Sequence, residues 1–300
     1  MRMKKDVSTL GSRNGEGTKQ LQKYLNLSMV LRVLVYFSAI CTVGVLAGLI
    51  VYILVMGIPN LTPDLFAWEY TSDNGSVVPA LLNTLIMVAV TLLMAVPIGI
   101  CSAIYLVEYA SKSSKLVKLI RITTETLSGI PSIVYGLFGY LCFSVFFKLG
   151  YSLLSGALTL SIMVLPSIMR TTEEALMSVP DTYREGSFGL GAGKLRTIFR
   201  VVLPSAIPGI LAGVILAIGR IVGETAALIY TAGTVAKVPG SLLGSGRTIA
   251  VHMYQLFNEG LSMEKGYGTG VVLLVLVLII NGISNLVGKK FAGSDGTAKS

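Results

Sequence analysis

Long apolar segments that carry almost no charge constrain this chain more than any other feature. Each has about 20 or more residues, which is the length that a helix needs to cross a hydrocarbon core of about 30 Å. The segments are 33–56, 77–107, 126–147, 149–169, 201–236 and 266–288. Because helices satisfy their own backbone hydrogen bonds in lipid, we predict an all-α membrane protein with six transmembrane helices.

The composition agrees with a membrane protein. Of the 300 residues, 53% are hydrophobic and 13% are charged, whereas an ordinary soluble domain is about a quarter charged. These values exclude a water-soluble globule and a disordered chain. Cys41, Cys101 and Cys142 all fall in apolar segments. We therefore expect them to be buried hydrophobic side chains and neither a disulfide set nor a metal site.

Basic residues are distributed unequally between the two sets of loops. Nineteen of the 24 Lys and Arg residues lie in 1–32, 108–127, 170–203 and 289–300, and four lie in the opposite loops. By the positive-inside rule the first set is cytoplasmic, and an even number of helices then puts both termini in the cytoplasm. The net charge of +9 is thus mainly a topology signal and does not indicate nucleic acid as a partner.

The domain organisation follows from these segments. Residues 1–32 form a basic cytoplasmic tail, and 33–56 form a first transmembrane helix that lacks a signal-peptide cleavage site and is retained. Residues 77–290 form the main transmembrane domain, which contains a long cytoplasmic loop at 171–203. Residues 291–300 are a second polar tail.

The long loop has a distinctive spacing. Pro180 interrupts its first part, and Asp181 or Thr182 could cap a new helix. Glycines in the following stretch would let another surface approach the backbone closely. The pattern is Glu185-Gly186-Ser187, three residues, Gly191, nine residues, Val201, one residue, and Leu203-Pro204.

This spacing resembles the cytoplasmic loop of ABC importer permeases, which reads Glu-Ala-Ala, three residues, Gly, nine residues, Ile, one residue, Leu-Pro. The departures are Gly186, Ser187 and Val201. The resemblance implies a short coupling helix that docks on an ATP-binding subunit; an ordinary loop helix is the alternative. The neighbouring stretch 189–194 lacks the spacing of a phosphate-binding loop. We therefore expect no cofactor and no enzymatic activity in this chain, with ATP and Mg²⁺ used by a separate ATPase.

Two charges lie inside the fifth apolar segment. Arg220 is about 18 Å along a helix from Pro208, near the middle of the bilayer, where an arginine costs about 2.5 to 3.5 kcal/mol. The spacing to Glu224 predicts one helical face and an ion pair. The pair could simply fix helix packing. Alternatively, the planar guanidinium could bind a tetrahedral oxyanion in a translocation pathway.

The segment 220–226 resembles the signature of phosphate-specific ABC permeases, and Gly223-Glu224-Thr225-Ala226 is similar to the PstA type of subunit. Segments 128–138 and 166–173 resemble its third and fourth spans. The resemblance implies a type I ABC importer permease fold in the bacterial cytoplasmic membrane, with inorganic phosphate as substrate. It places Arg220, Glu224 and Thr225 in the substrate pathway. It also implies a PstC-type second permease, a PstB-type ATPase dimer and an extracytoplasmic PstS-type binding protein as partners.

Other interpretations remain open at this stage. The chain could transport another oxyanion such as sulfate or molybdate, or could be the PstC-type subunit. Outside the ABC class it could be a secondary transporter or a channel. His252 has a surface or packing role or relays protons. Arg170, Thr171, Glu173 and Glu174 guide an exiting anion or anchor a helix end.

Overall fold

The computed structural model describes residues 3–111, 114–258, 260 and 262–293. Every regular element in these ranges is helical, as the sequence predicts. The chain divides into two compact units, Met1–Val55 and Met56–Ser300.

The first unit is the greater part of one long helix, α1 (Met3–Gly57). Its part from residue 28 onward is long and apolar enough to span a membrane, which agrees with the predicted first span. The helix also runs through most of segment 1–32, for which we predicted a polar tail. No proline occurs before Pro59, so no residue in this stretch forces the helix to end.

In the described part of the second unit, four further helices are long enough to cross a membrane: α2 (Val78–Ile104), α5 (Leu153–Met177), α8 (Leu203–Gly223) and α11 (Met263–Gly293). A bent pair, α3 (Lys115–Ser128) followed by α4 (Ser132–Gly139) and η4 (Tyr140–Phe146), passes the same test together. The described part of the chain therefore holds five spans, or six if the bent pair counts as one. The last predicted tail, 291–300, lies mostly outside the described residues.

The bend of 103° within this pair corrects the prediction of one straight span over 126–147. Gly129 and Pro131 separate the two helices, and a proline disfavours helical conformation in the residue before it. The hydroxyl of Tyr135 donates to the carbonyl of Leu127 across the bend at 2.8 Å. The buried Tyr135 side chain thus fixes the angle between α3 and α4.

Helix α5 lies at the centre of the second unit and packs against α2 and α8. The shared face of α5 is apolar and fully buried, and it contains Ala157, Leu160, Val164 and Ile168. These positions recur every three or four residues, so they lie on one side of the helix. Small residues bring the neighbouring backbones close: a methyl group at Gly209 would lie 2.6 Å from the side chain of Ala175.

The fifth apolar segment is not one helix, contrary to our prediction for 201–236. Helix α8 ends at Gly223, Glu224 is extended with ψ 127°, and the short helix α9 (Ala226–Thr231) follows. A loop then leads to α10 (Ile249–Asn258).

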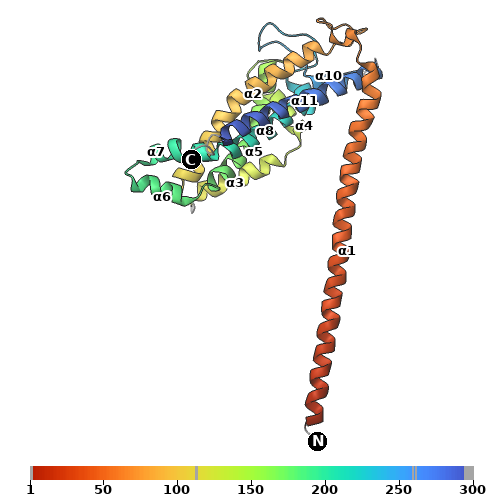
Figure 1. Ribbon diagram of the computed structural model, residues 1–300. Helices are drawn as coiled ribbons and strands as arrows, with labels where there is room; N and C mark the ends of the chain where they lie inside the picture. The colour runs from red at the N-terminus through yellow and green to blue at the C-terminus, as the bar shows by residue number, and fades with distance from the viewer. Residues whose placement is uncertain (1–2, 112–113, 259, 261, 294–300) are drawn as a thin grey trace. The chain divides into compact units, whose positions relative to one another are not determined.

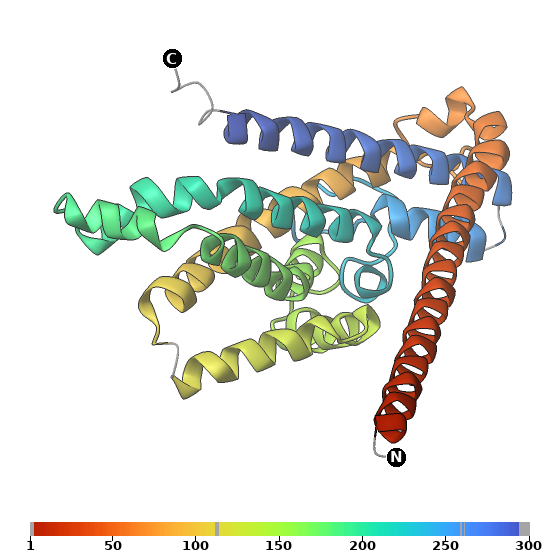
Figure 2. The ribbon, with the colours of Figure 1, turned by 60° about the horizontal axis from the view of Figure 1, so that its bottom comes forward.

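The two ends of the second unit differ in their elements (Figures 1 and 2). At one end lie α6 (Asp181–Gly189), α7 (Lys194–Thr197) and the turn η5 (Ile198–Val202). At the other end lies α10. The turn η3 (Tyr105–Tyr109) continues α2.

The cysteines differ from our expectation. Cys41 and Cys101 are exposed on this chain and Cys142 is partly exposed, so none is a buried core residue. All three are free thiols. Helices in a membrane can present apolar side chains outward, because lipid is as apolar as a protein core.

Candidate translocation and coupling sites

Arg220 lies in the last turn of α8 and lines a cavity of about 720 Å³. The cavity also takes Ser167 from α5 and Asn281 from α11. A methyl group added at Gly219 would meet no atom within 4 Å, so there is open space beside the arginine. One charged donor and two neutral polar side chains therefore line the same space, although they come from three different helices.

Glu224 does not pair with Arg220. Among the ion pairs of the described residues, none joins these two side chains, because the helix ends between them. Glu224 is instead buried, and its Oε1 accepts a hydrogen bond of 3.1 Å from the backbone N–H of Ala227. The expected ion pair is thus wrong, and the carboxylate satisfies a free N–H at the start of α9.

Thr225 faces a second cavity of about 600 Å³. Its polar lining includes Tyr230 from α9, and Tyr254 and Gln255 from α10. Arg220 does not line this cavity, and Thr225 does not line the first. The three residues that the sequence analysis grouped as one pathway site are therefore divided between two cavities and one helix junction.

The first half of the loop motif is open to the surroundings. Helix α6 begins directly after Pro180, as expected, and no residue of α6 is buried. Methyl groups at Gly186, Gly189 or Gly193 would meet nothing within 4 Å. Gly191 has φ +82°, a conformation that other residues rarely adopt.

Exposed apolar side chains alternate with these glycines along the sequence and follow them. Leu190 is 91% exposed, and the others are Tyr183, Phe188, Leu195 and Phe199. We call these five residues the α6–α7 apolar patch. An apolar patch of this kind on a loop is typical of a surface that binds another protein.

The second half of the motif is structural. Val201 and Leu203 are partly buried, and Pro204 lies in the first turn of α8, where a helix does not need its N–H. In the first half, the Ser187 hydroxyl pairs with the buried Thr197 hydroxyl at 2.8 Å, which connects α6 to α7. Glu185 is exposed and available for contact with a partner.

The predicted cap of α6 is absent. Pro180 occupies the N-cap position, and no side chain caps the helix. The carboxylate of Asp181 instead accepts a hydrogen bond of 3.2 Å from Nη1 of Arg184. Arg184 was not among the predicted site residues, because a single arginine in a basic loop gives no signal of its own.

The charged residues at the end of α5 already have partners within the chain. Arg170 pairs with Glu174 at 3.0 Å, and Glu173 forms an ion pair with Arg121 of α3. They line a cavity of about 250 Å³ together with Glu125. These pairings favour the anchoring role that we considered for this group over the binding of an anion.

His252 is fully buried in α10, so the packing role predicted as one alternative is correct and a surface position is wrong. Its Nε2 lies 3.1 Å from the carbonyl of Gly75, which requires the ring to donate from that nitrogen. Burial, followed by the positive charge of Arg247, lowers the pKa of His252 to about 3. The imidazole is therefore neutral at physiological pH.

Comparison with known proteins identifies the family. The family described as binding-protein-dependent transport system inner membrane component matches residues 95–293. A Bacillus subtilis protein named probable ABC transporter permease protein YqgI is 34% identical over 256 residues, which are 79% of this chain and 87% of the relative. The phosphate transport system permease protein PstA of Pasteurella multocida is 35% identical over 230 residues, covering 75% of this chain and 81% of the relative.

Solved structures agree in fold. A bacterial ABC transporter involved in the import of alginate matches with a TM-score of 0.62 and 17% identity over 90% of this chain and 96% of that one. The inward-facing methionine transporter MetNI matches with a TM-score of 0.57 and 20% identity, covering 72% and 94%. The alternatives of a channel and a secondary transporter are not favoured. The chain belongs to the binding-protein-dependent transport system inner membrane components, the permease subunits of ABC importers, and it is a transport subunit of the cell membrane.

Proposed function

We propose that this chain is the PstA-type permease subunit of an ATP-driven importer of inorganic phosphate, and that it forms half of the translocation pathway. The observation that carries the proposal is Arg220, a charged donor on a membrane helix that lines a cavity with two neutral polar side chains. The identity of 35% to a PstA protein supports phosphate over sulfate or molybdate.

Arg220 supplies the charge complementarity for the anion. Its planar guanidinium can donate two parallel hydrogen bonds to two oxygens of a tetrahedral oxyanion. The hydroxyl of Ser167 and the amide of Asn281 can each donate to a remaining oxygen. One permanent charge with neutral neighbours favours weak binding, which suits a pathway that must release its substrate.

Glu224 and Thr225 have separate roles in this proposal. Glu224 fixes the junction between α8 and α9 through its hydrogen bond to Ala227. Thr225, directly after the junction, contributes a hydroxyl to the second cavity, which precedes or follows the Arg220 cavity along the pathway. The junction thus sets the relation between the two polar positions.

The α6–α7 apolar patch binds the ATPase subunit. Glu185, Gly186, Ser187 and Gly191 form the face of contact, while Val201, Leu203 and Pro204 attach this face to α8. ATP and Mg²⁺ are bound and used by that PstB-type partner. A PstC-type permease supplies the other half of the pathway, and a PstS-type binding protein delivers phosphate from outside. The α6 end then faces the cytoplasm, as do both termini.

Reconstitution in liposomes tests the function. The four kinds of subunit are assembled, and uptake of radiolabelled phosphate, sulfate and molybdate is measured with and without ATP. We expect ATP-dependent uptake of phosphate and little of the others. Equal uptake of sulfate and phosphate would contradict the substrate assignment, and uptake by this chain alone without ATP would contradict the ABC mechanism.

The pathway residue is tested in the same system with Arg220→Gln. We expect normal assembly and loss of phosphate uptake, because glutamine keeps polar donors but not the charge. Lys237→Gln is the matched control, since it removes one positive charge from an exposed position in a loop that lines neither cavity. Normal uptake by the Arg220→Gln transporter would remove this residue from the pathway.

A further inference from the structure

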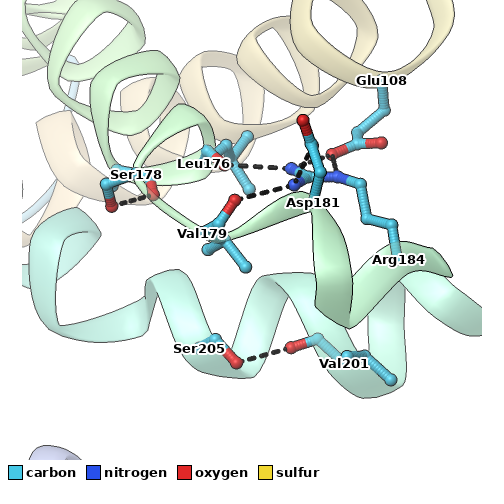
Figure 3. Close-up of polar contacts among 9 residues, drawn as sticks. Glu108, Leu176, Ser178, Val179, Asp181, Arg184, Val201 and Ser205 are labelled. Atoms are coloured by element: carbon cyan, nitrogen blue, oxygen red, sulfur yellow. Dashed lines mark hydrogen bonds and ion pairs between the residues drawn. The ribbon is translucent and has the colours of Figure 1, made fainter. Parts of the chain in front are cut away.

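Arg184 connects the exposed helix α6 to two membrane helices (Figure 3). The guanidinium has five N–H groups, and the structure gives it five hydrogen bonds at 2.7 to 3.2 Å. Its side chain is only 15% exposed, although no residue of α6 is buried as a whole. This side chain therefore points away from the free surface of α6 and into the body of the chain.

The first attachment is to the end of α2. Both Nε and Nη2 of Arg184 donate to Oε1 of Glu108, at 3.1 and 2.7 Å, and Glu108 lies in η3, the continuation of α2. The Glu108 side chain is only 9% exposed, so this pair is little screened by water. Removing one partner would leave a nearly buried charge without its counterion.

The second attachment is to the end of α5. Nη2 donates to the carbonyl of Leu176 at 3.0 Å, and Nη1 donates to the carbonyl of Val179 at 2.9 Å. The last carbonyls of a helix have no partner within the helix and carry a partial negative charge, so a cation at this position satisfies both needs. Arg184 thus caps α5 while it holds Glu108.

A separate cation–π contact joins α7 to η3, the same continuation of α2 that Arg184 reaches. Nζ of Lys194, in α7, lies 4.7 Å from the ring centroid of Tyr109, in η3. Beneath these contacts, a buried apolar cluster joins α2, α5, η5 and α8. Neither of these contacts replaces Arg184, because among the described residues only Arg184 provides charged hydrogen bonds from α6 itself to both α2 and α5.

We propose that Arg184 is the positioning residue that transmits movement of the ATPase-bound α6 to the membrane helices α2 and α5. The inference rests on the docking role proposed above for α6. A planar guanidinium with every donor occupied holds three elements in one fixed geometry. When the ATPase displaces α6, the ends of α2 and α5 must then move with it. Lysine, a compact charge with three donors on a flexible stem, cannot hold the same acceptors at once.

The test uses the assembled transporter in liposomes and measures phosphate uptake per ATP hydrolysed. For Arg184→Gln we expect the ATPase to remain bound and uptake per ATP to fall about tenfold or more, because a buried, charged network is lost. Arg184→Lys should restore little of the uptake per ATP that Arg184→Gln loses. The double variant with Glu108→Gln should be no worse than Arg184→Gln alone, because the two side chains act as one unit. Lys118→Gln, at an exposed position of α3, is the control for lost positive charge.

Unchanged uptake per ATP in Arg184→Gln would overturn the inference, and so would release of the ATPase, since the residue would then serve docking itself. The docking role is tested separately by Leu190→Asp, which should release the ATPase. If Leu190→Asp keeps the ATPase and its activity, the docking proposal fails independently of Arg184.

Rigidity can be measured directly by electron paramagnetic resonance. Spin labels are placed at Thr182→Cys in α6 and at native Cys101 in α2, with Cys41 and Cys142 replaced by serine. We expect one narrow distance distribution, equal with and without ATP, and a broader one after Arg184→Gln. An equally narrow distribution in the variant would contradict a mechanical role.

Discussion

His252 shows how a single buried side chain links α10 to the loop before α2. Its ring lies against Tyr70 in an edge-to-face arrangement with centroids 5.7 Å apart, and it bonds to the carbonyl of Gly75. Arg247 also stacks on Tyr70, with its guanidinium carbon 4.4 Å from the centroid of the tyrosine ring. Burial of the ring, and then this cation, oppose protonation of the imidazole, so the cluster is stable only with neutral histidine.

The pH dependence of stability follows from this neutral state. The unfolded chain protonates His252 near pH 6.5, whereas the folded chain does so near pH 3. The stabilising contribution is therefore complete above pH 6.5, and it falls by up to about 1.4 kcal/mol per pH unit as the pH decreases toward 3. Thermal unfolding of the detergent-solubilised transporter between pH 8 and 5 measures this slope.

The matched variant is His252→Gln, whose side-chain amide can still donate to the Gly75 carbonyl but does not titrate. We expect its unfolding temperature to depend less on pH than that of the wild type. Parallel curves for the two proteins would show that His252 does not titrate with the proposed shift.

A second prediction at the scale of single residues concerns the hydrogen bond that Glu224 accepts from the backbone of Ala227. Glu224→Ala leaves the N–H of Ala227 without its acceptor and should destabilise the α8–α9 junction by about 1 kcal/mol. Glu224→Gln keeps an acceptor oxygen and should retain most of that stability and most of the uptake. The unfolding temperature and the phosphate uptake of both variants, measured in the assembled transporter, test this prediction. Equal losses in the two would mean that the negative charge, and not the hydrogen bond, is required.

At the scale of single residues, the important charges could be predicted from the sequence, but their partners could not. Arg220 was recognisable because a charge inside an apolar segment is unusual. The predicted ion pair with Glu224 was wrong, because a spacing of four residues puts two side chains on one face only where the helix is continuous. Ser167 and Asn281 were detectable only as polar residues within apolar segments. Arg184 gave no signal, because its role depends on contacts between helices that are distant in sequence.

Entire helices were predicted well where hydropathy alone decides, and poorly where the chain bends. The average hydropathy of a segment does not change when a helix turns by 103° at Pro131 or ends at Gly223. In the coupling loop, by contrast, the break was predicted correctly, because Pro180 and the glycines mark where a helix begins and where the chain turns. Its short helix α6 was predicted from these residues and is present.

The same chemical change at two glycines tests the helix α6, which contains Gly186, and the turn after it, which contains Gly191. In Gly186→Ala the new methyl meets nothing within 4 Å in a helical position, so α6 should gain about 0.5 to 1 kcal/mol. In Gly191→Ala the φ of +82° opposes a side chain and should cost about 1 kcal/mol or more. Replacing Gly191 with a bulky residue should in addition separate the ATPase from the permease.

Co-purification of the ATPase and the unfolding temperature of the complex measure both effects. Gly186→Ala is the control, because it introduces the alanine that the family pattern has at this position. If Gly191→Ala leaves ATPase binding, stability and uptake as in the wild type, the left-handed turn at Gly191 does not shape the docking surface.

At the scale of the whole molecule, the number of spans decides on which side each terminus lies. The described residues form five helices that are each long enough to cross the membrane, and the bent pair of α3 and α4 is the sixth. The second of the two parts of that pair, Ser132–Phe146, would be only about 22 Å long as an α-helix. With six spans both termini share one side, and with five they lie on opposite sides.

The excess of basic residues in 1–32, 108–127 and 170–203 predicts six spans with both termini in the cytoplasm. Protease-cleavable tags at the two ends test this prediction in spheroplasts of the producing cells. Both tags should resist added protease in intact spheroplasts and be cut after lysis, and a tag inserted at Ser241 in the exposed loop after α9 should be cut in both. Cleavage of one terminal tag in intact spheroplasts would mean an odd number of spans, in which case the bent pair enters and leaves the membrane on the same side.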